Sequence, residues 1–145
     1  MNIEFKISPN PLNVLIFLNV LIFIVALFIT NNLGLDKNMF TILSGLSTFD
    51  ISKGALYQLV TANFLHIQVL HFIFNMYSLI VAGRLVDYFY GGKKLLITYI
   101  IGGIAASLLT YLGGVIEQTN ILSLGASGSI FALVGLLIEI GRAHV

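Results

Sequence analysis

The chain has 145 residues, of which 58% are hydrophobic and only 9% are charged, and its formal net charge is +1. A soluble domain carries about 25% charged residues, so this composition excludes a fully hydrated surface and indicates a membrane protein. The small net charge and the lack of a basic cluster exclude the electrostatic signature of nucleic-acid binding, and no nucleic-acid partner is expected. Cysteine is absent, which excludes disulfides and thiolate metal sites.

Four apolar stretches follow one another along the chain, separated by charged residues. A membrane-spanning helix needs about 20 mostly apolar residues. We expect spans at residues 12–30, 67–87 and 94–112, and a fourth at 127–138 and beyond. The first follows Pro9 and Pro11, which suit a helix start, and it is longer than the apolar core of about 7–15 residues in a cleaved signal peptide. The sequence therefore predicts an all-α, polytopic transmembrane helical bundle.

Basic residues orient these spans, because cytoplasmic loops collect Lys and Arg. Arg84, Lys93 and Lys94 lie at the connection between the second and third spans, and Lys6 precedes the first. Both places are assigned to the cytoplasm, with the N-terminus there, and the fourth span then begins with Ser127 near the outer face. We expect a multi-pass integral membrane protein. The short N-terminal segment favours a bacterial plasma membrane.

The second span opens with three hydrogen-bonding side chains, those of His66, His71 and Asn75. His71 and Asn75 are four residues apart and share a helix face, and His66 lies slightly off that face. Polar groups are costly inside a bilayer, so they suggest function. The same residue types also hydrogen-bond neighbouring helices as packing contacts, and this alternative stays open. No metal site is expected, because metalloprotease ligands occur as H-E-x-x-H on one face.

The fourth span begins with GASG, in which Ser127 is flanked by glycines. Gly125 and Gly128 leave room for another backbone to approach. A serine at the start of a helix has its amide at the positive end of the helix dipole, which favours a developing negative charge. The alternative is ordinary packing, because Gly128, Ala132 and Gly135 form a small-residue stripe. The predicted topology places GASG and the histidine cluster at the same depth, which favours a shared site.

At this point the sequence resembles the rhomboid intramembrane serine proteases over roughly residues 55–138. The stretch LVTANFLHIQVLHFIFNMYSLIVAGRLVDYFYG resembles the second helix of that family, and LGASGSIFALVG resembles the start of its fourth. The resemblance implies a six-helix core, of which four spans are present here. It also implies a loop over residues 31–65 that is partly embedded at the outer leaflet.

The resemblance assigns roles residue by residue. It makes Ser127 the nucleophile, with His71 and Asn75 as oxyanion-hole donors. His66 is implied to support the loop and the helix end. Three further residues are implied to support the site: Gly125, Gly128 and Phe131.

The implied activity is that of an endopeptidase that cleaves single-span membrane proteins near the outer surface through a Ser–His dyad. The expected partners are the lipid bilayer and the transmembrane helix of a protein substrate. No cofactor is implied. The natural substrate and the oligomeric state stay open.

Several positions depart from the family pattern. Tyr57 and Gln58 replace a frequent Trp-Arg pair, which we expect to weaken the polar anchoring of the loop. Asp87 replaces a glutamate of the second helix. Phe131 stands where a tyrosine usually packs on the catalytic histidine, so we expect activity to be tuned rather than lost.

The last two core helices are missing from the chain, and with them the histidine base, so residues 1–145 are predicted to be inactive. His144 is expected on the opposite side of the bilayer from Ser127. The domain is expected to be a partial rhomboid-like membrane domain over residues 1–138. Residues 139–145 are predicted to be a non-native tail, because EIGRAHV back-translates to a common sequencing adapter.

Three other functions compete with this one. A non-catalytic rhomboid-like protein would bind membrane helices without needing an oxyanion hole. A channel or transporter would need polar residues in several spans, whereas Ser107 and Thr110 are expected to be satisfied by backbone carbonyls. An aspartyl protease would need two intramembrane aspartates, and Asp87 stands alone near the cytoplasmic edge.

Overall fold

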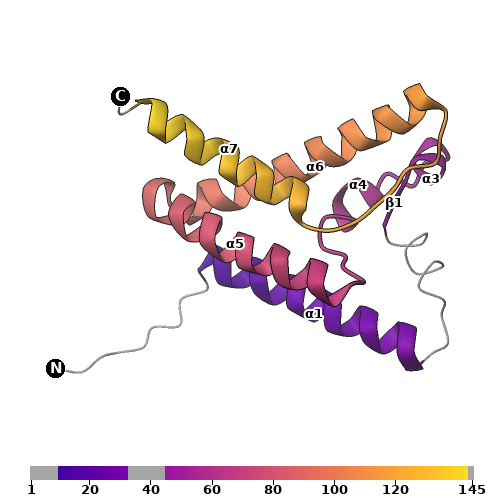
Figure 1. Ribbon diagram of the computed structural model, residues 1–145, viewed down its shortest axis with the longest axis horizontal. Coiled ribbons are helices and arrows are strands. Elements are labelled where there is room, and N and C mark those ends of the chain that lie inside the picture. Colours follow the sequence, from indigo (N-terminus) through magenta and orange to yellow (C-terminus); the bar gives the residue numbers. More distant parts are fainter. Residues whose placement is uncertain (1–9, 33–44, 144–145) are drawn as a thin grey trace.

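The computed structural model describes residues 10–32 and 45–143, and the described chain is a bundle of helices (Figure 1). The helices are α1 (Pro11–Asn32), α3 (Thr48–Ser52), α4 (Gln58–Thr61), α5 (Val69–Tyr90), α6 (Gly92–Glu117) and α7 (Ser127–Ala143). Two short strands, β1 (Leu46–Ser47) and β2 (Leu122–Ser123), pair antiparallel, with Leu46 opposite Ser123 and Ser47 opposite Leu122. The prediction of an all-α membrane bundle is confirmed.

Among the described residues, α1, α5 and α6 are long and apolar enough to cross a membrane, and residues 127–139 of α7 form a shorter apolar helix. The first three predicted spans coincide with α1, α5 and α6, and α6 extends further at its C-terminal end than residue 112. The fourth span, from residue 127 onward, stays a prediction. Helix α6 ends where Gln118 adopts a left-handed conformation, with φ of 54°. Helix α7 begins at Ser127, as predicted, and continues to Ala143. His144 lies outside the described residues, and the non-native tail stays a prediction.

Helix α5 is joined to α6 by a tight turn at Gly91, and the start of α1 lies beside it. We call this end of the bundle, where α5 ends and α1 and α6 begin, the turn end. Gly91 connects α5 to α6 with a positive φ of 80°. Asn10 caps α1, because its Oδ1 accepts the Leu12 N–H at 2.8 Å. Its Nδ2 donates to Asp87 Oδ2 at 2.8 Å, which ties the start of α1 to the end of α5. The shorter carboxylate at position 87 thus has a partner.

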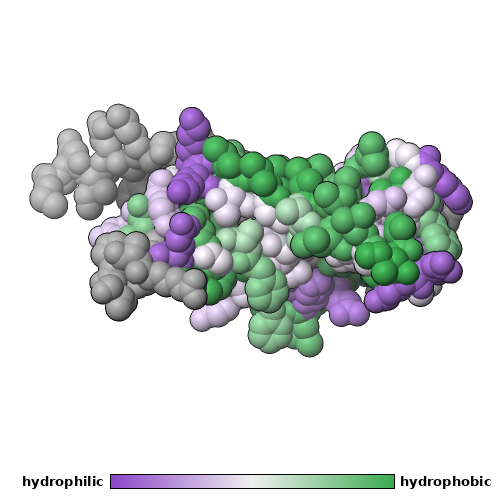
Figure 2. All heavy atoms as spheres, turned by 90° about the horizontal axis from the view of Figure 1, so that it is seen from above, coloured by the Kyte–Doolittle hydropathy of each residue, from purple (hydrophilic) through white to green (hydrophobic). Residues whose placement is uncertain are grey.

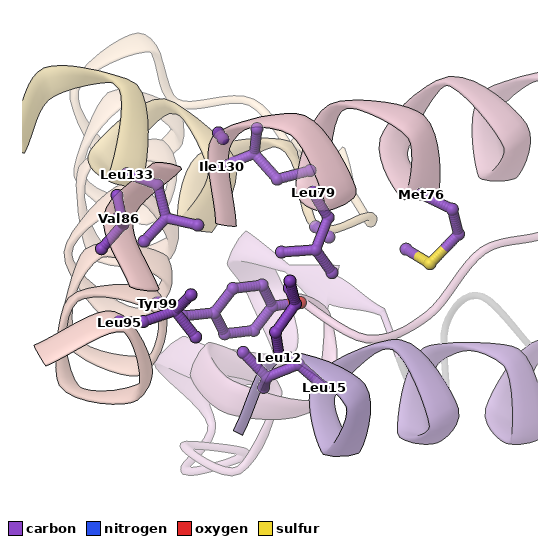
Figure 3. Close-up of a cluster of buried hydrophobic side chains, with 11 residues drawn as sticks. Leu12, Leu15, Met76, Leu79, Val86, Leu95, Tyr99, Ile130 and Leu133 are labelled. Carbon is purple, nitrogen blue, oxygen red and sulfur yellow. The ribbon is translucent and has the colours of Figure 1, made fainter. Parts of the chain in front are cut away.

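A continuous apolar core lies where the four long helices meet (Figure 3). Leu79, Val86, Leu95, Tyr99 and Leu133 are fully buried there. Leu12 and Leu15 add the contribution of α1. This core fixes how α5 and α7, which carry the candidate site, lie relative to each other.

The outer surface is also apolar. Figure 2 shows hydrophobic residues over much of the visible face, with hydrophilic residues mainly toward the two ends. Leu70, Phe74 and Phe131 are 70%, 67% and 75% exposed. Contiguous exposed apolar surface on this scale is unfavourable in water and is what a lipid-facing protein presents.

Helices α6 and α7 pack closely through small residues. A Cβ atom at Gly102 would collide with Ala132, and one at Gly128 would lie 2.5 Å from the Ala106 Cβ. Close approach through small residues is the common way for membrane helices to pack. The packing interpretation of the stripe therefore holds for Gly128 and Ala132, whereas Gly135 faces open space.

Candidate active site

The segment that leads into α7 is held by two backbone hydrogen bonds. The Gly125 N–H donates to the Ala62 carbonyl at 2.8 Å, and the Ala126 N–H donates to His66 Nε2 at 3.3 Å. The Ile130 N–H donates to the Ala126 carbonyl at 3.0 Å. The amides of Ser127 and Gly128 therefore lie in the first turn, where N–H groups lack intrahelical acceptors.

Gly125 occupies a position that only glycine fits. Its φ is +112°, a conformation that residues with a side chain rarely adopt. A Cβ atom there would lie 2.6 Å from His71 Cε1 and 3.0 Å from His71 Nε2. The backbone just before Ser127 is thus pressed against the imidazole ring of His71.

Ser127, His71 and Asn75 line one pocket of about 290 Å³ between α5 and α7. The other lining residues are mostly apolar: Phe74, Ser78, Ile130, Phe131 and Val134. Asn75 is buried, and its Nδ2 donates to the carbonyl of His71 at 2.8 Å. An amide nitrogen carries two hydrogens, so a second N–H remains for a group in the pocket.

His66 lies just before α5 and is fully buried. Its Nε2 accepts the Ala126 N–H, and its Nδ1 lies 3.3 Å from the Phe64 carbonyl. Both bonds form together only in the neutral ring with the proton on Nδ1. Burial lowers the pKa of His66 to about 4; the bond to Phe64 opposes this, and the nearby charge of His71 adds to it. His66 is therefore neutral at pH 7 and holds the segment before Ser127.

A second, smaller pocket of about 90 Å³ lies on another side of Ser127. Its polar lining includes the side chains of Asn63, Ser107, Thr110 and Ser123. Asn63 Nδ2 donates to Ser107 Oγ at 3.1 Å, so the expectation that a backbone carbonyl satisfies Ser107 is not what the structure shows. Thr110 does donate to a backbone carbonyl, that of Ala106, at 3.0 Å.

The loop before α5 is hydrogen-bonded to the segment before α7. Gln58 is buried, and its Oε1 accepts the Ser47 N–H at 2.9 Å. The Thr48 N–H donates to the Ile121 carbonyl, and the Ile121 N–H donates back to Thr48 Oγ1, each at 3.2 Å. Gln58 thus supplies a polar anchor inside the loop, and an anchoring weaker than that of the usual Trp-Arg pair stays a prediction.

Sequence reasoning missed a buried polar connection from α1 to the loop. Asn19 is fully buried, and its Nδ2 donates to the Tyr99 hydroxyl at 3.1 Å. The Tyr99 hydroxyl in turn donates to the carbonyl of Asn63 at 3.5 Å. The available signal was an asparagine near the middle of a mostly apolar span, which also carries Asn13 at its start. In the described part of the chain, no three His, Asp or Glu side chains come together as a metal site.

The residues that line the pocket fall within a known protein family. A family model described as "Rhomboid domain" matches residues 53–143, which include all of the residues that line the 290 Å³ pocket. The chain belongs to the rhomboid family. With its apolar helices, this rhomboid is an integral, multi-pass membrane protein.

Curated relatives agree with this assignment. The chain is 35% identical over 82 residues to Rhomboid-like protein 11, chloroplastic, of Arabidopsis thaliana, which covers 57% of this chain and 28% of that protein. It is 31% identical over 94 residues to Rhomboid protease GluP of Bacillus subtilis (strain 168), covering 65% of this chain and 18% of the relative. It is 34% identical over 84 residues to Rhomboid-like protease 3 of Toxoplasma gondii, covering 58% and 30%. The chain thus spans less than a third of the length of these relatives.

Proposed function

We propose that this rhomboid chain is part of an intramembrane serine endopeptidase in which Ser127 is the nucleophile. The observation that carries the proposal is the shared pocket: Ser127 from α7 and His71 and Asn75 from α5 line the same cavity of about 290 Å³. Two of the relatives are named proteases, which supports the same activity. The activity, the substrate and the partners of the whole protein are all part of this proposal.

The proposed chemistry uses these three residues of the pocket. The hydroxyl of Ser127 attacks the scissile carbonyl, and negative charge develops on the carbonyl oxygen. The free N–H of Asn75, the His71 ring and the Ser127 amide at the start of α7 are the donors for that charge. His66, Gly125 and Gly128 act by fixing this backbone, and Phe131 covers the pocket from α7.

A base must remove the proton of Ser127, and we propose that it comes from a later helix of the longer protein. In the described residues, His71 is committed to the oxyanion role and both ring nitrogens of His66 have partners. The chain of residues 1–145 is accordingly proposed to be inactive by itself. We propose no cofactor for this chemistry.

The proposed substrate is a single-span membrane protein whose helix enters from the lipid. Phe74, Phe131 and Val134 make one side of the pocket apolar, and all three are exposed at the molecular surface. A transmembrane segment can therefore approach without leaving an apolar environment. We propose a bacterial plasma membrane, with the N-terminus in the cytoplasm and Ser127 near the outer surface.

The test uses a longer protein that continues this chain through a complete rhomboid core, with a reporter span as substrate. Ser127→Ala is expected to abolish cleavage while membrane insertion stays unchanged. Ser52→Ala, on α3 away from the pocket, is the matched control and is expected to keep full activity. Cleavage that persists in Ser127→Ala would remove this serine from the mechanism. Capture of the reporter without cleavage by the unsubstituted protein would favour the non-catalytic helix-binding function.

A further inference from the structure

The turn end carries a group of exposed cations that the proposed chemistry does not use. Arg84 lies on α5, and Lys93 and Lys94 lie in the first turn of α6; all three are exposed. Asp87, in their midst, is half-buried and accepts the hydrogen bond from Asn10. Asp87 therefore has a hydrogen-bond partner inside the protein, whereas the three cations are exposed.

Three aromatic residues, Tyr88, Phe89 and Tyr90, lie at the same end of α5. Tyr88 is 83% exposed and Phe89 is 56% exposed, and their rings meet edge-on with centroids 5.0 Å apart. Lys94 Nζ lies 4.4 Å from the centroid of the Tyr90 ring, a cation–π contact that holds the ammonium group beside the rings. Tyrosine rings of this kind lie at the level of lipid headgroups.

We propose that Arg84, Lys93 and Lys94 form a binding surface for the phosphodiester headgroups of anionic phospholipids. Arg84 precedes Gly91 by seven residues, which is roughly 10 Å along a helix, a few ångströms more than the depth of about 5–7.5 Å of one headgroup layer. Its aliphatic stem can lie along the apolar helix while the guanidinium reaches the phosphate, which it can bind through two N–H groups. Lys93 and Lys94 supply positive charge at the water-facing edge of the same headgroup layer.

The charge of the headgroup selects the ligand class. A phosphatidylcholine headgroup carries its own cation, which cancels the attraction to three basic side chains. A phosphatidylglycerol headgroup keeps its negative charge. Glu139 is an exposed carboxylate that would repel an anionic headgroup, but it belongs to α7, whereas the three cations belong to α5 and α6. The surface on α5 and α6 therefore favours the anionic lipid.

The test is native mass spectrometry of the full chain in a neutral detergent, with palmitoyl-oleoyl phosphatidylglycerol or the matching phosphatidylcholine added. We expect the anionic lipid to be retained in preference to the neutral one. Each cation replaced by glutamine is expected to weaken that retention roughly fivefold. Salt at about 0.5 M is expected to reduce it further, because the side chains are exposed.

Two variants control for charge and for position. Lys53→Gln removes an exposed cation just after α3 and is expected to leave lipid retention unchanged. The triple variant Arg84→Lys, Lys93→Arg, Lys94→Arg keeps the charge and is expected to keep the retention. Equal retention of both lipids, or full retention after all three cations become glutamine, would overturn the proposal. So would competition by inorganic phosphate as strong as that of the lipid, because the surface would then bind the free anion.

Discussion

Gly125 shows at the scale of one residue how the backbone before Ser127 is placed. Its positive φ and its contact with His71 are separate constraints, and each disfavours a Cβ atom. Gln58 and His66 act in the same region by accepting backbone N–H groups of Ser47 and Ala126. Each of these side chains satisfies a buried donor that would otherwise cost about 1–3 kcal/mol.

Gly125→Ala is expected to destabilise the protein by about 1–3 kcal/mol, from backbone strain alone, and to displace His71. Gly135→Ala is the matched control, because Gly135 is in α7 and faces open space. That control is expected to stabilise the helix by about 0.5–1 kcal/mol. Denaturant unfolding in detergent measures both changes. Equal effects of the two substitutions would contradict the special position of Gly125.

His66 makes stability depend on pH in a defined window. Its pKa is about 4 in the folded protein, against the ordinary value of 6.5. The unfolded chain binds the proton more readily, so the stability that His66 contributes is complete above pH 6.5 and is lost as the pH falls toward 4. The total change is of the order of 3 kcal/mol.

The measurement is the free energy of unfolding across this window for the unsubstituted chain and for His66→Gln. Glutamine can accept the Ala126 N–H but does not titrate. We expect the dependence on pH between 6.5 and 4 to be largely removed in the variant. An unchanged slope would show that other groups carry it.

At the scale of elements, the contact between α6 and α7 decides where the first turn of α7 lies. Gly102 meets Ala132, and Gly103 meets Ser129, with no space for a further carbon atom at either glycine. The strand pairing and hydrogen bonds between residues 46–48 and 120–123 then hold the segment that enters α7. Packing on one side and hydrogen bonds on the other therefore position Ser127.

Gly102→Ala tests the packing part of this account. The added methyl group collides with Ala132, so we expect the overpacking to cost about 1–3 kcal/mol and to move α7 away from α6. Gly113→Ala on the same helix is the control, because its Cβ would be 4.0 Å from Ile121, an ordinary contact. Thermal unfolding in detergent compares the two. Similar melting temperatures would contradict close packing at Gly102.

Over the whole molecule, the apolar surface and the polar ends are consistent with a bilayer around the long helices (Figure 2). Polar side chains inside the bundle form connections between elements: Asn19 bonds Tyr99, and Tyr99 bonds the backbone of Asn63. The site lies at the end of the bundle where α5 and α7 begin, opposite the basic turn end. The proposed chemistry and the proposed contact with headgroups thus belong to opposite ends of the bundle.

The sequence was sufficient for the long elements and the first residue of α7. Charge-free windows of span length mark membrane helices directly, and the GASG string marks the helix start. The short elements α3 and α4 and the strand pair were not predicted, because stretches of two to five residues have no periodic pattern. The role of Gln58 was missed for a related reason: its partner Ser47 is eleven residues away, and only the folded loop brings them together.

The most direct test of the central claim is the rate of reporter cleavage by the longer protein carrying Asn75→Ala, with unfolding measured on the same samples. If the amide of Asn75 donates to the developing oxyanion beside Ser127, the rate is expected to fall by roughly 10²–10³-fold while stability changes little. A loss of stability with the cleavage rate per folded molecule unchanged would contradict the account and make Asn75 a packing residue of α5.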